Sequence, residues 1–373
     1  MPSRLPWLAV ALLGAGDGGP AVPAWTPAAP GHAWSFPRDH FAHPGYRNEW
    51  WYFTGTVEAE GEPGRRFGYQ VTFFRVGLAP GRPPGDSAWA ARDALMGHAA
   101  VTDLSAGGHR FSEVLYRAAP LLAGFGEPPD ARLAWSLGPP GTGVPWEARI
   151  DGSRFRVTAE DRSRGFALDL ELTPARTPVL QGPGGLSRKS DREGYASLYY
   201  SLTRLSTRGT LVLDGRAFPV RGESWMDREF GSSQLAPDQA GWDWFALRLR
   251  DGRDLMLYLL RGADGRPRFR SGTLVGRDGS PTWLREGEFR VQVLRRWRSP
   301  ATGAEYPARW AIEVPAAGLS LRVDSAAADQ ENRGGRGPDY WEGAVDVLGP
   351  GGEPAGEGYV ELTGYGTGNR PPI

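Results

Sequence analysis

Apolar and polar residues alternate with a period of two over most of the chain, which is typical of half-buried β-strands. The clearest examples are residues 67–73 and 166–172, where every second residue is apolar. Asp-Gly pairs separate several such runs and favour tight hairpin turns, at residues 214–215, 251–252, 264–265 and 278–279. Because no long segment carries a helical apolar pattern, we predict an all-β, antiparallel protein.

The length and composition favour two domains. The chain has 373 residues, 40% of them hydrophobic, with 53 Gly and 33 Pro, a mixture that suits many short strands joined by turns. The stretch from Thr177 to Glu193 is the least patterned part of the interior. We therefore expect one β-domain over residues 34–190 and a second over residues 191–373, each a barrel or a sandwich.

The N-terminus resembles a secretory signal. Arg4 precedes the apolar run from Leu5 to Leu13, and small residues follow up to Ala24. We expect a signal peptide over residues 1–24 and an exported protein, periplasmic or secreted; a buried strand or a frayed terminus is the alternative. The chain has no cysteine, which excludes disulfides and thiolate chemistry.

Charge and motifs narrow the function. The 43 basic and 43 acidic residues give zero formal net charge, so we expect no nucleic-acid partner. The sequence holds no Gly-x-Ser-x-Gly elbow, no Walker loop and no His-Glu-x-x-His motif, which removes support for the commonest serine hydrolases, nucleotide enzymes and zinc proteases. We expect no cofactor.

Acids among aromatic rings are the main chemical candidates. Alternation sends Glu49 and Trp51 to one face of a strand, where apolar surroundings would raise the pKa of the carboxyl group and suit a general acid. Further along, Trp225 and Asp227 share a face, as do Trp242 and Trp244 on either side of Asp243. We predict Asp227, Glu49 and Asp243 as catalytic acids, with Trp51, Trp225, Trp242 and Trp244 lining one dry pocket.

Two alternatives stay open for these residues. Asp227 or Glu229 could form a structural ion pair with Arg228 or Arg221 that caps a packed core. His40 and His43, followed by Glu49, could supply metal ligands. Hydrogen-bonded or exposed histidines explain the same spacing, and we expect no metal.

Several blocks resemble the AttH branch of the carotenoid 1,2-hydratase family. The similarity extends from about Phe36 to Tyr365, and the blocks that carry it include residues 36–40, 49–55, 69–75, 199–201, 225–233, 238–245, 340–345 and 358–365. They also bring in Tyr69 and Tyr200 as candidate ligand-binding residues. Asp227 matches the acid of the hydratase branch, whereas Met226 and Arg228 stand beside it where that branch carries histidine.

The resemblance implies two tandem lipocalin-like domains around an apolar ligand, a terpenoid, polyene or lipid. It implies acid-catalysed hydration of an alkene, with Asp227 as the proton donor. A periplasmic protein that binds and delivers an apolar molecule, with a membrane-associated or export-system partner, is one alternative. A secreted hydrolase is the other.

Overall fold

The computed structural model describes residues 24–81, 87 and 89–366. Almost all regular structure is β-strand, and the described helices are single 3-10 turns: η1 (Arg38–His40), η2 (Pro183–Gly185) and η3 (Pro315–Ala317). The expected signal peptide lies outside the described residues apart from Ala24. No helix within the described ranges is long and apolar enough to cross a membrane.

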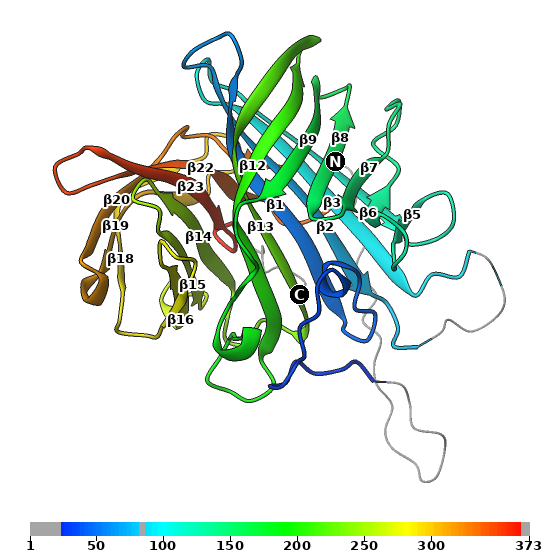
Figure 1. Cartoon of the computed structure of the whole chain (residues 1–373), viewed down its shortest axis with the longest axis horizontal. Helices are drawn as coiled ribbons and strands as arrows, with labels where there is room; N and C mark the ends of the chain where they lie inside the picture. Colours follow the sequence, from blue (N-terminus) through cyan, green and yellow to red (C-terminus); the bar gives the residue numbers. More distant parts are fainter. Residues whose placement is uncertain (1–23, 82–86, 88, 367–373) are drawn as a thin grey trace.

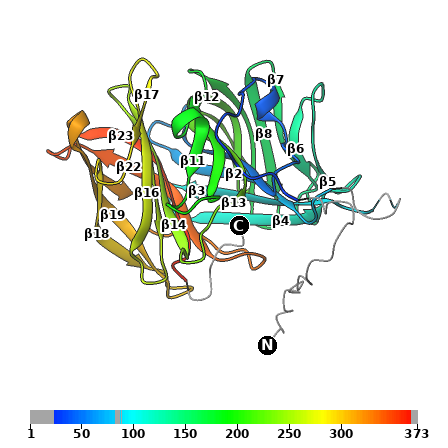
Figure 2. The same cartoon turned by 90° about the horizontal axis from the view of Figure 1, so that it is seen from below.

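The strands form two antiparallel sheets, which Figures 1 and 2 show side by side. The main path of the first sheet runs β4-β3-β2-β1-β13-β12-β9-β8-β7-β6-β5, with β10 and β11 paired to β12. Its strands are β1 (Asn48–Ala59), β2 (Arg66–Gly77), β3 (Asp93–Asp103), β4 (His109–Arg117), β5 (Ala123–Phe125), β6 (Arg132–Ser136), β7 (Trp146–Asp151), β8 (Arg154–Asp161), β9 (Phe166–Pro174), β10 (Val179–Leu180), β11 (Leu186–Arg188), β12 (Ala196–Leu213) and β13 (Arg216–Ser233).

The second sheet runs β17-β16-β15-β14-β23-β22-β20-β19-β18, with β21 paired to β22. Its strands are β14 (Gly241–Leu249), β15 (Asp254–Arg261), β16 (Pro267–Val275), β17 (Pro281–Leu284), β18 (Arg290–Arg298), β19 (Glu305–Val314), β20 (Leu319–Ser325), β21 (Glu331–Asn332), β22 (Tyr340–Leu348) and β23 (Pro354–Leu362). The two curled sheets confirm the predicted tandem lipocalin-like, all-β fold.

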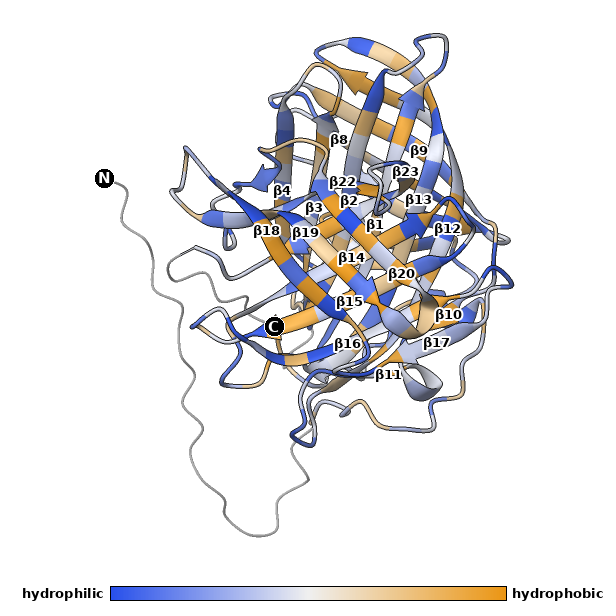
Figure 3. Ribbon diagram, turned by 90° about the vertical axis from the view of Figure 1, so that its left-hand side faces the viewer, coloured by the Kyte–Doolittle hydropathy of each residue, from blue (hydrophilic) through white to orange (hydrophobic). Residues whose placement is uncertain are grey.

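The predicted alternation and hairpins are present. Figure 3 shows hydrophobic and hydrophilic residues alternating along β18. The apolar faces of residues 67–73 and 166–172 lie in the core of the first sheet. Asp214 and Gly215 both have positive φ values, 48° and 80°, as the tight turn between β12 and β13 requires.

The sheets divide the chain between Ser233 and Gly241, not at residues 190–191. Strands β12 and β13 pair with each other along their whole length, and β13 also pairs with β1, so this hairpin belongs to the first sheet. The unpatterned stretch that suggested the boundary contains only the short strands β10 and β11 and the turn η2. The alternation of apolar and polar residues is lost there because β10 and β11 are only two and three residues long, and both pair with β12 within the first sheet.

The outer faces of the two sheets contact each other. A third apolar cluster contains Tyr52, Tyr199 and Trp225 from the first sheet and Trp244 and Tyr359 from the second. Gly68 lets the backbones approach closely, because a methyl group there would lie 3.1 Å from Cβ of Ala344 and 3.3 Å from the Tyr359 hydroxyl. We call this buried contact the sheet interface.

Candidate functional site

Asp227 lies on β13 and points into the sheet interface. Its carboxylate accepts hydrogen bonds from the Ser201 hydroxyl and, at 2.7 Å, from Nε1 of Trp225. Burial raises its pKa from 3.8 to about 7, and the negative charge of Glu229 adds to that rise, while hydrogen bonds from Ser201, Trp225 and Tyr199 oppose it. A carboxyl group with this pKa can donate a proton at neutral pH.

Asp227 is part of a row of polar residues that crosses five strands of the first sheet. Directly paired residues in an antiparallel sheet point to the same face. The register pairs His98 with Thr72, Thr72 with Tyr52, Tyr52 with Asp227 and Asp227 with Ser201. All five are buried. The row brings residues from the first 100 positions of the chain next to residues beyond 200.

A second row faces it from the other sheet. There the register pairs Glu342 with Glu361, Glu361 with Trp244 and Trp244 with Tyr258. The Trp244 ring meets Tyr52 edge-on at 5.1 Å between centroids, so the rows are in contact. We call the two rows together, with Trp225, Trp242 and Glu229, the interface site.

The interface site holds four carboxyl groups and few cations. Lys189 lies 2.7 Å from Glu229 and is the partner of that acid. Among the described residues, no Lys or Arg forms an ion pair with Asp227, Glu342 or Glu361. Burial raises the pKa of Glu361 to about 7 and that of Glu342 well above its usual range, where the charge of Glu361 adds to the effect.

Two predicted ring positions complete this site. Trp242 flanks it and donates its indole N–H to Glu361 at 3.0 Å. Trp244 donates to the Tyr199 hydroxyl at 3.2 Å, and its ring meets that of Trp225 at 6.4 Å. The predicted residues Asp227, Trp225, Trp242 and Trp244 are therefore brought together.

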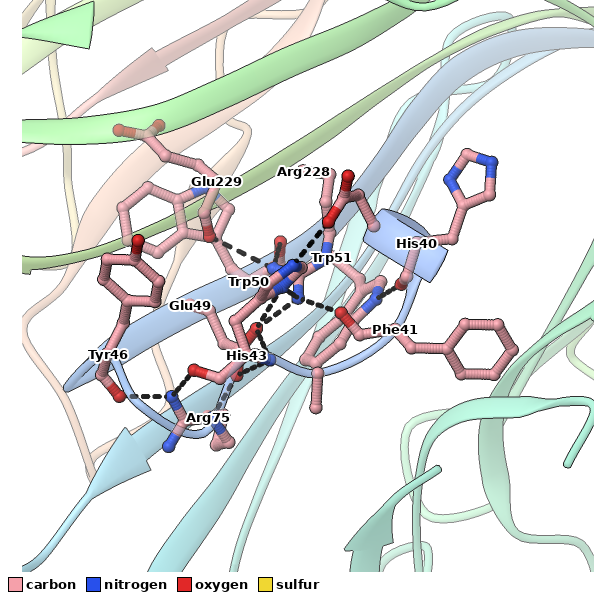
Figure 4. Close-up of polar contacts among 12 residues, drawn as sticks. His40, Phe41, His43, Tyr46, Glu49, Trp50, Trp51, Arg75, Arg228 and Glu229 are labelled. Atoms are coloured by element: carbon pink, nitrogen blue, oxygen red, sulfur yellow. Dashed lines mark hydrogen bonds and ion pairs between the residues drawn. The ribbon is translucent and has the colours of Figure 1, made fainter. Parts of the chain in front are cut away.

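Glu49 does not act as predicted. Its carboxylate is held between the guanidinium groups of Arg75 and Arg228, and its two oxygens share the backbone N–H of His43 in a bifurcated hydrogen bond, as Figure 4 shows. Burial alone would raise its pKa, but Arg228 and Arg75 outweigh burial and hold it well below the usual range. The prediction of a protonated acid was wrong, because arginines from β2 and β13 reach it.

Asp243 and the remaining aromatics lie elsewhere, so the prediction of one shared pocket was wrong. Asp243 accepts a 2.7 Å hydrogen bond from Arg261 and a second from Tyr365, on the opposite face of β14 from its tryptophan neighbours. Trp51, Tyr69 and Tyr200 belong to the interior core of the first sheet. Trp51 and Tyr52 are adjacent on β1, so they point to opposite faces of the sheet.

These interior aromatics have structural partners. The Arg228 guanidinium lies over the Trp51 ring at 3.9 Å. The Tyr69 hydroxyl is 2.5 Å from Oγ of Ser224, and the Tyr200 hydroxyl is 2.6 Å from Nδ1 of His40. Each polar tip is thus satisfied inside a packed core.

A different histidine group from the expected one brings three possible metal ligands together. His32, Asp39 and His43 place one ligand atom each within 4.8 Å of one another. Arg228 donates to Nδ1 of His43 at 3.2 Å, which leaves the Nε2 proton of a neutral ring to bond Asp39 at 2.9 Å. A metal ion would have to replace that proton. His40 and Glu49 are outside this group.

Sequence reasoning missed Glu342, Glu361, Tyr52 and His98. Alternation places Tyr340, Glu342 and Ala344 on one face, so an acid on an otherwise buried face was the available signal. The sequence did not indicate that the first sheet packs against that face of the second sheet.

One surface pocket of about 410 Å³ opens where the sheets meet, apart from the residues predicted from sequence. Both sheets contribute to its lining, which includes Thr56, Arg66, Glu223 and Glu357. Its lining is rich in charged side chains, unlike the aromatic interface site.

Fold and site together define a two-sheet, lipocalin-like β-protein with carboxyl groups of raised pKa between its sheets. The AttH-like family model matches residues 27–365, and the chain belongs to this family. A crystal structure of a Nitrosomonas europaea protein described as AttH is 33% identical, covers 91% of this chain and 99% of its own, and has a TM-score of 0.80.

Two further relatives are more distant. Kievitone hydratase from Nectria haematococca is 15% identical, with a TM-score of 0.64 over 91% of this chain and 97% of its own, which bears on the fold alone. The dehydratase AsqC of Emericella nidulans is 26% identical over 240 residues, 60% of this chain. The matched part spans 65% of that curated relative, less than two thirds of its length.

Proposed function

We propose that this protein adds water to an alkene, or removes water from the corresponding alcohol, in an apolar terpenoid, polyene or lipid-like molecule. The observation that carries the proposal is the buried carboxyl of Asp227, whose pKa of about 7 lets it hold a proton among aromatic rings. The name of one relative, the dehydratase AsqC, supports the same reaction class.

In the forward direction, Asp227 donates its proton to one alkene carbon, and a C–H bond forms as the π bond breaks. The cation on the other carbon is stabilised by the π faces of Trp225, Trp244 and Tyr52. Water then forms the C–O bond and returns a proton to the carboxylate. In reverse, Asp227 protonates the hydroxyl group, and the C–O bond breaks to release water. The Asp227 carboxylate then takes a proton from the carbon next to the cation as the double bond forms.

Deuterium incorporation tests this reaction. Hydration in D₂O places deuterium on carbon, so a panel of isoprenoid alkenes and alcohols can be incubated with the protein and analysed by mass spectrometry. We expect incorporation by the wild type and a loss of at least about a hundredfold in Asp227→Asn, the usual contribution of a general acid. Asp169→Asn removes a surface carboxylate paired with Arg156 and serves as the matched control.

Retention of full incorporation by Asp227→Asn would refute its role. If the wild type binds apolar molecules but forms no product from any of them, the protein is instead a binding and delivery module. Export is part of the proposal and is tested separately, by N-terminal sequencing of the protein isolated from its native cell.

A further inference from the structure

Several buried polar atoms of the interface site lack hydrogen-bond partners. Within the described ranges, no hydrogen-bond partner is found for four such atoms: both carboxylate oxygens of Glu342, the Tyr52 hydroxyl and Nε2 of His98. All three residues are more than nine-tenths buried. The hydroxyls of Tyr52 and Tyr340 lie near enough to Glu342 to lower its pKa somewhat, without regular hydrogen-bond geometry. Unsatisfied buried groups are costly and rare, so their gathering here calls for a polar partner.

The register explains why these atoms converge. Tyr52 and His98 belong to the row of the first sheet, and Glu342 begins the facing row of the second. Nδ1 of His98 is 2.8 Å from the Tyr340 hydroxyl, and Tyr340 is two residues from Glu342 on β22. The three unpartnered groups therefore lie along one border of the interface site, and Tyr52 is directly paired with Asp227.

We infer that Glu342 and Tyr52 bind the hydroxyl group of a neutral, apolar alcohol. We also infer that the carboxyl groups of the interface site exclude anionic head groups such as carboxylates and phosphates. A hydroxyl both donates and accepts, as an acceptor carboxyl and a donor phenol require. An anion would only accept, and at pH 8 it would face Asp227 and Glu361, whose pKa values of about 7 leave them largely ionised and which form no ion pair with a Lys or Arg in the described part of the chain. This inference rests on the proposed function, because it places the alcohol oxygen beside Asp227.

Binding of two probes with the same chain tests the inference without any need for turnover. Farnesol carries a neutral hydroxyl and farnesoic acid a carboxylate that is ionised at pH 8. Tryptophan fluorescence reports on the site, since Trp225, Trp242 and Trp244 lie in it. We expect the wild type to bind farnesol at least about tenfold more tightly than farnesoic acid, which corresponds to roughly 1.4 kcal/mol.

Three variants sharpen the test. Glu342→Leu removes the acceptor and should weaken farnesol binding by about tenfold. Glu361→Gln removes a carboxyl group that is largely ionised at pH 8, since its pKa is about 7, so it should narrow the preference for farnesol over farnesoic acid. Glu313→Gln makes the same change at a half-exposed glutamate of the second sheet, paired with Arg290, and should leave both affinities unchanged.

Equal binding of both probes by the wild type, absence of farnesol binding, or an unchanged preference in Glu361→Gln would each overturn the inference. So would a crystal structure grown with farnesol that shows only an ordered water between Glu342 and Tyr52. If the preference is found but no deuterium enters any substrate, the hydroxyl site stands and the proposed reaction fails.

Discussion

Glu342 and Glu361 stand directly opposite each other on β22 and β23, where Glu342 is buried in the contact between the two sheets and Glu361 is partly buried. Two carboxyl groups on directly paired residues cannot both ionise without a large cost in free energy, because the surroundings have a low dielectric constant. The structure raises the pKa of both. Together with Asp227, they give the sheet interface three carboxyl groups whose pKa values are raised.

The rate of the proposed reaction should depend on pH through Asp227. Since the protonated carboxyl is the acid and its pKa is about 7, we expect kcat/KM to be level below pH 6 and to fall roughly tenfold per pH unit well above pH 7. Steady-state kinetics from pH 5 to pH 9 would measure this profile. A rate that rises steadily to pH 9 would contradict it and point to a base.

Stability should respond to Asp227 with a defined sign. Its folded pKa of about 7 exceeds the ordinary value of 3.8, so the folded state binds the extra proton and loses stability as pH rises from about 4 to about 7. Over that window the penalty is at most about 4 kcal/mol. Asp227→Asn, which cannot ionise, should therefore gain stability relative to the wild type on going from pH 5 to pH 8.

Urea unfolding at both pH values measures this difference, with Asp169→Asn as the exposed control. A relative stability of Asp227→Asn that does not change between pH 5 and pH 8 would mean that the carboxyl titrates normally.

Glu49 should behave in the opposite way. Its pKa is depressed by Arg228 and Arg75, so its contribution is present above the unfolded value, near 4.5, and is lost as pH falls through the folded one. Glu49→Gln leaves two guanidinium groups buried without their shared carboxylate. We expect a loss of about 3–5 kcal/mol at pH 7, measured by urea unfolding.

A stability loss below 1 kcal/mol in Glu49→Gln would show that the arginines find other partners. Arg75 also bonds Asp93 at 2.6 Å, so Asp93→Asn is an informative companion variant of the same network.

Two tyrosines offer a matched comparison of hydroxyl groups. Within the described ranges the Tyr52 hydroxyl has no partner in regular hydrogen-bond geometry, whereas that of Tyr69 is 2.5 Å from Oγ of Ser224. Tyr52→Phe should therefore change the free energy of unfolding by less than about 0.5 kcal/mol or stabilise the fold, while Tyr69→Phe should cost about 1 kcal/mol. Thermal unfolding of both variants checks this, and a costlier Tyr52→Phe would mean that its hydroxyl is satisfied in the free protein.

The sequence was a good guide wherever the controlling interactions are local. Alternation set the strands and their buried faces, and Asp-Gly pairs set hairpins such as the one at Asp214 and Gly215, because both depend on neighbours along the chain. It also placed Trp225 with Asp227, and Trp242 with Trp244, on common faces. The family blocks pointed to the same strands.

Only the tertiary structure decided which face of the first sheet packs against which face of the second. Glu49 and Asp227 looked alike in sequence, as acids beside tryptophans. Pairing of β1 with β2 and β13 gave Glu49 two arginines, whereas no Lys or Arg among the described residues forms an ion pair with Asp227. The protonation of a carboxyl depends on burial and on charges brought from distant segments, and local sequence carries neither. For the same reason Glu342 and Glu361 emerged as part of the site only when the two sheets came into contact.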